Sequence, residues 1–423
     1  EIRKGDWRLT TRERKRILTE SIFGVDIDRQ AVEVTKLSLL LKVLEGESQQ
    51  TLQRELNILR ERALPDLDDN IKRGNSLIGA DYYSLVGNAS ETDLLGVHPF
   101  DWAVEFPKVF TGAGGFDVVV GNPPYDVLEK ERGKASWPHN ALTDYKQFRP
   151  DYAPALGGKL NLFRFFVVRA LALTKSKGRF GMIVPLAIIA DITSARTRKH
   201  VLLSLTDLRA DCFPQKDNAS RRVFKDAKLS TVVLTGQRAA ISAASAQVRL
   251  RVYPWNSMHD VPKEATIRMK DAAVIDPESI PIPLVGEDEW ALLRKVQTGS
   301  RVVRFEKLHG VEITRGEINQ TVFREFITSD PTDVRLVKGV EVGPFFMRST
   351  RSQGVQEWFN EMGYLRANNR KKNVHVRRIA TQRITGVDER RRLVAAIVEP
   401  PAYFADSTNS ITVKDWRSQR LSI

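Results

Sequence analysis

Short apolar runs alternate with longer stretches of periodic apolar residues along the first 240 positions of the chain. The short runs are bounded by Gly, Asn, Asp or Pro, which is typical of strands. Strands are predicted at 22–28, 70–77, 116–120, 179–185 and 229–234. Helices are predicted at 1–20, 29–45, 48–62, 160–175 and 195–205. Strands that alternate with helices favour an α/β domain with a mainly parallel sheet.

The helix predicted at 29–45 has a clear start, because Asp28 precedes it and Asp is a good N-cap residue. Its apolar residues recur at helical spacing, which predicts an inner face. That face comprises Ala31, Val34, Leu37, Leu41 and Leu44.

The run Phe116–Val120 is rich in β-branched residues and predicts a buried strand. It is followed by Gly121 and then by Asn122, Pro123, Pro124 and Tyr125. Two prolines fix φ and remove two backbone donors, so the loop presents acceptors, including the Asn122 side-chain oxygen. Tyr125 adds an aromatic face, and together these groups suit a planar amine such as an adenine edge. The alternative is a turn that only ends the strand.

Asp26 follows a strand and precedes a helix, where a carboxylate can accept both hydroxyls of a ribose. Ligands of parallel sheets bind beyond the carboxyl ends of the strands. We therefore expect the Asp26 and Asn122 loops to open onto one edge of the same sheet. An ordinary strand-end turn is the alternative for Asp26.

Asn75 also follows a strand and is a candidate contact for an adenine ring, with Gly74 allowing close approach of a ligand. Asx residues in turns usually bond their own backbone, which is the alternative. Phe224 precedes another strand and is either a second wall opposite Tyr125 or a core residue.

Charge and composition narrow the class of partner. The chain carries a net charge of +14, which favours a polyanion. Residues 341–423 contain 15 Lys and Arg against 8 Asp and Glu, which is half of that net charge. Arg with guanine, and Asn or Gln with adenine, are the usual major-groove pairs. The candidate DNA contacts are Arg370, Lys371, Lys372, Arg377, Arg378 and Gln382. The alternative is a solvated charged face.

Cys212 is the only cysteine, so the chain has no intrachain disulfide, and a reducing compartment such as the cytoplasm is expected. The sequence has no run of membrane-spanning length and no signal peptide. The six histidines show no metal-ligand spacing, so no metal site is expected.

Composition changes divide the chain into three parts. Residues 239–246 are small and read as a junction. We expect a first domain at 1–240, a connecting region at 241–300 and a C-terminal domain at 301–423. The last part has short β-like runs separated by Gly, Asn and basic residues.

Asn122-Pro123-Pro124-Tyr125 resembles the catalytic motif of S-adenosylmethionine-dependent methyltransferases that act on adenine N6 in DNA. The segment 22–44 looks like the ribose-binding motif of the large type IIG restriction–modification and phage-defence methylases. Further segments are similar to that family at 74–77, 178–185, 222–224, 313–316, 336–339 and 378–382. The resemblance is strong over 20–235 and weaker beyond 300.

The resemblance implies a Rossmann-like methyltransferase domain followed by an α+β target-recognition domain. It implies that Asn122, Pro123, Pro124 and Tyr125 are catalytic, with Tyr125 and Phe224 at a flipped target base. It assigns S-adenosyl-L-methionine as cofactor. The cofactor contacts would be Asp26, Ile27, Asn75, Ser76 and Leu77.

The expected partners are double-stranded DNA and other restriction–modification or defence subunits. The family's Gly-rich cofactor loop would precede Ile22 and is not found, so we expect the chain to be N-terminally incomplete. Two alternatives stay open. One is an amino-methyltransferase acting on RNA or on protein glutamine. The other is a methylase-like DNA-recognition subunit without activity.

Overall fold

The structure is a computed structural model, and it describes most of the chain. The described residues are 9–45, 65–86, 96–128, 137–240, 246–297, 308–349, 355–368, 374–385, 391 and 393–414. The helix predicted at 48–62 lies outside them.

The chain divides into two compact units. Unit 1 comprises Glu1–Pro214 and Ser220–Arg294, and unit 2 comprises Gln215–Ala219 and Lys295–Ile423. The residues that we expected in a connecting region, up to Arg294, are therefore part of unit 1. They form two strands, one complete helix and most of a second helix in that unit.

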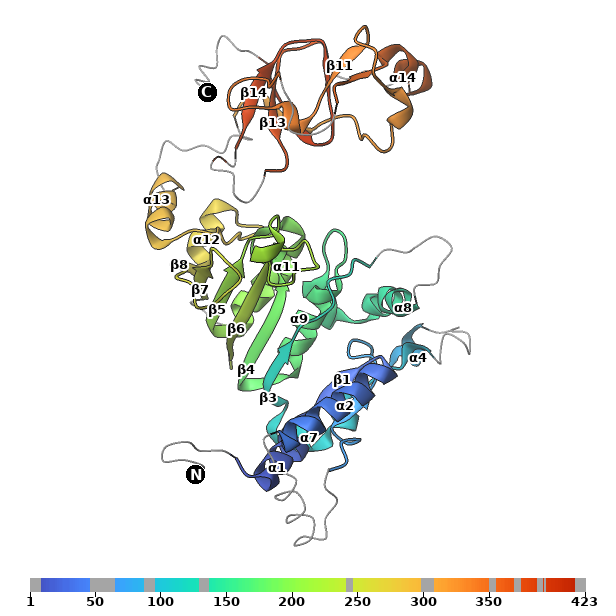
Figure 1. Cartoon of the computed structure of the whole chain (residues 1–423), viewed down its shortest axis with the longest axis vertical. Helices are drawn as coiled ribbons and strands as arrows, with labels where there is room; N and C mark the ends of the chain where they lie inside the picture. The colour runs from blue at the N-terminus through green and yellow to red at the C-terminus, as the bar shows by residue number, and fades with distance from the viewer. Residues whose placement is uncertain are drawn as a thin grey trace. The chain divides into compact units, whose positions relative to one another are not determined.

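Unit 1 contains the α/β part of the chain (Figure 1). Its strands are β1 (Gly24–Asp26), β2 (Ile71–Arg73), β3 (Phe116–Gly121), β4 (Thr174–Pro185), β5 (Leu205–Phe213), β6 (Thr231–Arg238), β7 (Gln247–Val252) and β8 (Lys263–Arg268). Its α-helices are α1 (Thr11–Ser21), α2 (Arg29–Leu44), α4 (Tyr82–Val86), α6 (Trp102–Glu105), α7 (Pro107–Ala113), α8 (Trp137–Tyr145), α9 (Leu162–Leu173), α10 (Ala187–Ala190), α11 (Ala195–Ser204), α12 (Met269–Ile275) and α13 (Glu287–Gln297). Short 3₁₀ turns are η1 (Lys146–Phe148), η2 (Pro150–Ala155), η3 (Ile192–Ser194) and η4 (Ala219–Arg221).

Six strands form one sheet in the order β3-β4-β6-β5-β7-β8. β3 pairs with β4 and β5 with β7 in parallel, whereas the other three pairings are antiparallel. Four of the six strands therefore run the same way. β1 and β2 pair in parallel as a separate two-stranded sheet. The α/β class expected from the sequence is confirmed.

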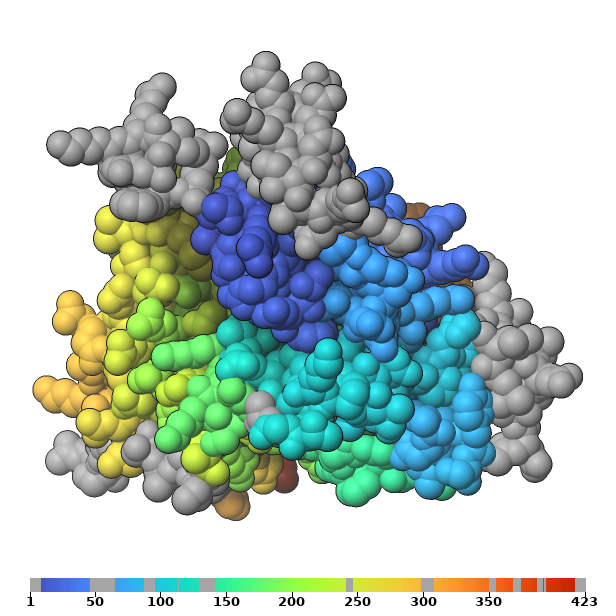
Figure 2. Space-filling view, turned by 90° about the horizontal axis from the view of Figure 1, so that it is seen from below, coloured from blue at the N-terminus to red at the C-terminus, as the bar shows by residue number. Residues whose placement is uncertain are grey.

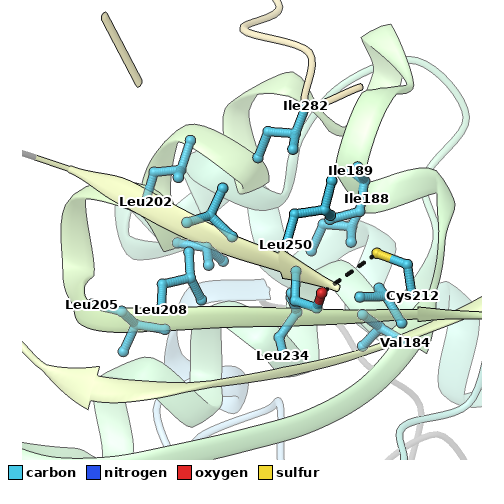
Figure 3. Close-up of a cluster of buried hydrophobic side chains, with 14 of the residues drawn as sticks. Val184, Ile188, Ile189, Leu202, Leu205, Leu208, Cys212, Leu234, Leu250 and Ile282 are labelled. Atoms are coloured by element: carbon cyan, nitrogen blue, oxygen red, sulfur yellow. Dashed lines mark hydrogen bonds between the residues drawn. The ribbon is translucent and has the colours of Figure 1, made fainter. Parts of the chain in front are cut away.

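One face of the six-stranded sheet is packed against helices. Phe180, Met182 and Val184 alternate along β4 and are buried, as the two-residue period of a strand requires. They belong to a cluster that also includes residues of α9, α10 and α11 (Figure 3). Cys212 lies in this cluster and donates to the carbonyl of Ala210. Burial of these apolar surfaces is the main stabilising contribution in unit 1.

Two predictions of burial are wrong. Val118 and Val120 of β3 are 56% and 75% exposed, so this strand is not buried on both faces. On α2 the buried residues are Val32 and Val43, whereas the predicted inner face is largely exposed. α2 is apolar on more than one side, so periodicity alone could not decide which side faces the core. The predicted N-cap is confirmed, because Asp28 Oδ1 accepts from the Gln30 amide at 2.8 Å.

α1 and α2 lie beside the segments that precede β3. Figure 2 shows them in blue against the cyan residues. Phe23, just before β1, and Phe116, at the start of β3, have ring centroids 5.8 Å apart. Phe106, between α6 and α7, contacts both rings. An aromatic cluster therefore links the β1–β2 pair to the start of β3.

Unit 2 contains two four-stranded sheets, β10-β12-β11-β15 and β14-β13-β16-β9. Its strands are β9 (Val311–Arg315), β10 (Ile327–Thr328), β11 (Val334–Val337), β12 (Glu357–Phe359), β13 (Arg378–Gln382), β14 (Ala395–Val398), β15 (Ala402–Phe404) and β16 (Thr408–Val413). Its helices are α14 (Glu361–Asn368) and the 3₁₀ turns η6 (Arg324–Phe326) and η7 (Gly339–Glu341). The α+β class expected here is confirmed. No helix in the described part of the chain has the length and apolarity needed to cross a membrane.

Candidate active site

The loop 122–125 begins directly where β3 ends at Gly121. Pro123 is buried, whereas Asn122 is exposed. The Tyr125 hydroxyl lies 3.2 Å from Asn122 Oδ1 and 3.2 Å from the carbonyl oxygen of Ile183 in β4. One hydroxyl proton serves these two acceptors, so Tyr125 orients the Asn122 side chain and ties it to the neighbouring strand.

The Tyr125 hydroxyl stays a donor over a wide pH range, because burial raises its pKa to about 12. Asn122 Oδ1 has a second lone pair, and its exposure leaves that acceptor accessible to a ligand. The loop therefore presents an amide oxygen whose orientation is set by Tyr125.

Asn161 holds the other side of the loop. Its Oδ1 accepts from the Phe163 amide at 3.4 Å and caps α9, while its Nδ2 donates to the Tyr125 carbonyl at 3.2 Å. Backbone bonds from Leu162 to Asp126 and from Leu128 to Leu160 extend this contact. The sequence analysis missed Asn161. An Asn before an apolar helix signals a cap, but nothing in the sequence signals its contact with Tyr125.

The Phe224 ring contacts the Tyr125 ring by an edge and does not stand opposite it as the wall of a base-binding sandwich. Their ring centroids are 6.3 Å apart, and the rings are inclined by 66°, an edge-to-face contact. A base stacked between parallel rings needs about 7 Å between them, two van der Waals layers. In this arrangement the space between the two rings does not fit a stacked base.

Asp26 and Asn75 lie at the same end of the β1–β2 pair, because Asp26 is in register with Arg73. Asp26 is exposed, and its Oδ1 accepts from the Asp28 amide at 2.8 Å. Asn75 is buried, and its Oδ1 accepts from the Leu77 amide at 3.1 Å. For Asn75 the alternative of an Asx turn is therefore what the structure contains.

The other candidate cofactor residues differ in accessibility. Leu77 is buried in a core cluster with Tyr152, so its side chain is structural. Ser76 and Ile27 are half-buried and use their carbonyls for internal bonds. Packing also requires Gly74, because a Cβ there would lie 2.3 Å from the Phe100 ring.

The expectation that the Asp26 and Asn122 loops share one sheet is wrong for the described residues. β1 is paired with β2, and β3 is paired with β4 in the separate six-stranded sheet. The alternation of strands and helices shows that strands exist, but it does not specify which edges are hydrogen-bonded.

The candidate DNA contacts fall into four groups. Arg370, Lys371 and Lys372 lie outside the described residues. Arg377 is exposed and pairs with Glu399 at 2.6 Å. Gln382 is half-buried, and its Nε2 donates to the Val342 carbonyl at 2.7 Å.

Arg378 is not available to DNA, which corrects the sequence interpretation. It is 4% exposed, and its guanidinium donates to both carboxylate oxygens of Glu317 at 3.1 and 3.2 Å. A basic cluster in the sequence does not distinguish a side chain that faces solvent from its buried neighbour.

Within the described ranges, no group of three or more His, Cys, Asp or Glu side chains is placed to hold a metal ion.

Comparison with known proteins relates part of this architecture to a family. Residues 20–210 match the model of the Eco57I restriction-modification methylase family. The chain is 29% identical over 203 residues to the type II restriction enzyme and methyltransferase RM.Eco57I of Escherichia coli. That match covers 48% of this chain but only 18% of the relative.

Two solved structures resemble the chain over most of its length. The type IIL restriction-modification enzyme MmeI, in complex with DNA, is 12% identical, with a TM-score of 0.44 over 95% of this chain and 58% of that one. The type ISP enzyme LlaGI, a nuclease-deletion mutant in complex with a DNA substrate mimic, is 10% identical. Its TM-score is 0.46, and the match covers 96% of this chain and 38% of that one. The match to the family model spans less than half of the chain, so residues 20–210 are similar to restriction–modification methylases.

Proposed function

We propose that this chain is a DNA adenine-N6 methyltransferase of a restriction–modification or phage-defence system. The observation that carries the proposal is the oriented acceptor at Asn122. Its side-chain oxygen is fixed by the Tyr125 hydroxyl, stays accessible and lies beside the Tyr125–Phe224 ring pair.

The chemistry of the loop suits an exocyclic amine. An adenine amine is a poor nucleophile because its lone pair is delocalised into the ring. Asn122 Oδ1 and the Pro123 carbonyl would accept its two N–H groups, which localises the lone pair on nitrogen. Positioning and fixed dipoles then supply most of the rate. The target must leave the duplex to reach this loop, and Tyr125 and Phe224 would contact the flipped base.

S-adenosyl-L-methionine is the cofactor we propose, and it supplies a methyl group activated by a sulfonium. The exposed Asp26 carboxylate fits the two hydroxyls of its ribose. Ile27 and Ser76, which follow β1 and β2 in the chain, would line the adenosine part. Asn75 is buried with its oxygen in an Asx turn, so we do not propose it as a contact.

Unit 2 is the part we propose for DNA target recognition. Residues 341–423 carry 15 of the chain's 66 basic residues against 8 acidic ones. Arg377 is the described candidate whose side chain is exposed. Arg370, Lys371, Lys372 and Gln382 remain sequence-based candidates for this interface. Other subunits of such a system are proposed partners.

Replacement of Asn122 tests the proposal. Asn122→Ala should abolish methyl transfer to duplex DNA while DNA affinity stays within a few-fold of wild type. Asn122→Asp keeps an acceptor oxygen and should retain part of the activity. The assay is transfer of radiolabelled methyl to DNA, with the modified base identified by mass spectrometry. Equal loss of affinity and activity would show that the loop is structural.

The same assay separates the alternatives. Methylation of RNA or of protein glutamine, but not DNA, would replace the proposed substrate. Absence of S-adenosyl-L-methionine binding in calorimetric titration, together with intact DNA binding, would instead indicate a recognition subunit without activity.

A further inference from the structure

A positively charged turn carries Phe224 to the candidate base site. We call residues 220–228 the basic turn. It contains Arg221, Arg222, Lys225 and Lys228 against a single acid, Asp226. Lys225 and Lys228 are exposed. Because the Phe224 ring touches Tyr125, this charge is concentrated next to the Asn122 loop.

The basic turn is fixed to a second loop, residues 253–260. Asn256 Nδ2 donates to the Arg222 carbonyl at 2.9 Å and to the Ser220 carbonyl at 3.3 Å. The Arg221 guanidinium lies 4.0 Å from the centroid of the Trp255 ring, a cation–π contact. The two loops are therefore one platform and not two independent segments.

The base of the platform is anchored in unit 1. Tyr253 is buried, and its ring stacks on Phe213 with centroids 5.0 Å apart and planes inclined by 12°. Its amide donates to the Cys212 carbonyl at 2.9 Å. The exposed side chains that follow Tyr253 are thus held in place by the core.

Trp255 is 45% exposed although Arg221 already covers part of its ring. A tryptophan that served only packing would bury more of its apolar area. Bases stack on aromatic rings whatever their sequence, and Lys or Arg beside the ring contacts phosphates. An exposed Trp with flanking lysines matches that chemistry.

We propose that the basic turn and Trp255 bind the DNA strand that carries the target base. Lys225 and Lys228 contact its phosphates, and Trp255 stacks on a base adjacent to the target. This inference rests on the proposed function, because it takes the strand to be the one whose base reaches Tyr125 and Asn122. We place the backbone of that strand beside Lys225 and Lys228 because they follow Phe224, whose ring contacts Tyr125.

Binding measurements with substituted proteins test the surface without any need for methyl transfer. Duplex DNA affinity is measured across a range of salt concentrations for wild type, Trp255→Ala, Trp255→Phe and the double variant Lys225→Ala/Lys228→Ala. The matched control is Lys108→Ala/Lys270→Ala, which removes the same charge from exposed positions on α7 and α12.

Trp255→Ala should weaken binding about tenfold, within the range for loss of one base–aromatic stack, and Trp255→Phe should restore most of it. The lysine double variant should reduce the slope of log affinity against log salt by about 1.8, two phosphate contacts on duplex DNA. The control should leave the slope unchanged. The proposal would be overturned if Trp255→Ala and Lys225→Ala/Lys228→Ala both bound DNA with the affinity and salt dependence of the wild type.

The outcome is separable from that of the proposed function. If the variants lose DNA binding but the wild type methylates nothing, the surface stands and the proposed activity fails. If the wild type methylates DNA and the variants bind and methylate normally, only the surface fails. Selective loss of RNA binding would overturn DNA as the partner.

Discussion

The buried Arg378–Glu317 pair provides a sharp test of the corrected role of Arg378. Its guanidinium also donates to Ser410 Oγ and to the Ala402 carbonyl, and it lies 4.0 Å from the centroid of the Phe404 ring. Arg378→Ala would leave the Glu317 carboxylate buried without its counter-ion. We therefore expect a loss of unit 2 stability and no direct effect on DNA contacts.

The size of the expected stability loss follows from the burial of this ion pair. Removing one partner of a buried ion pair costs about 3–5 kcal/mol. Unit 2 contains roughly 130 residues, so its unfolding entropy near the midpoint is about 0.3 kcal/mol per kelvin. Arg378→Ala should thus lower the midpoint of unit 2 by about 10–17 °C. Differential scanning calorimetry, with hydrogen exchange to assign the transition, measures this shift.

Arg377 provides the matched control, because it is adjacent in sequence but exposed. Its pair with Glu399 is a surface ion pair, worth about 0–1 kcal/mol, so Arg377→Ala should shift the midpoint by less than about 4 °C. The double variant Glu317→Leu/Arg378→Met removes both charges and should recover much of the stability. If Arg378→Ala unfolds at the wild-type temperature but binds DNA more weakly, our reasoning is wrong and the DNA-contact interpretation returns.

Three further predictions concern unit 1. Asn161→Asp keeps the α9 cap but removes the donor to the Tyr125 carbonyl, so the free energy of unfolding should fall by about 1 kcal/mol. The amides of residues 126–128 should exchange faster with solvent, and methyl transfer should fall. Wild-type exchange rates would show that Asn161 does not hold the loop in place. Burial raises the pKa of the Cys212 thiol, so Ellman's reagent should react only after unfolding, and rapid labelling of the native protein would contradict the packing. Burial and then Arg238 lower the pKa of His200, so the unfolded state binds more protons and stability should fall as pH drops below about 6.5. Urea denaturation at pH 7 and pH 5 should show a smaller loss in His200→Gln, and an equal loss would exclude this residue.

Local structure was largely predictable from the sequence. The start of α2 follows from Asp28, because a cap is decided by one side chain and the next two amides. The strand before Asn122 and the proline loop after it also follow from neighbouring residues. The helix predicted at 160–175 exists but ends earlier, at Leu173, and Gly178 lies within β4.

The sequence by itself therefore determined the α/β class of unit 1, the acceptor loop at Asn122–Tyr125 and the basic character of the C-terminal part. These properties depend on composition, spacing and local backbone preference. The tertiary structure decided that Tyr125 orients Asn122, that Asn161 holds Tyr125 and that Arg378 is buried beside Glu317. Each of these contacts joins groups whose distance and burial depend on how the elements pack, and a linear pattern carries no record of either.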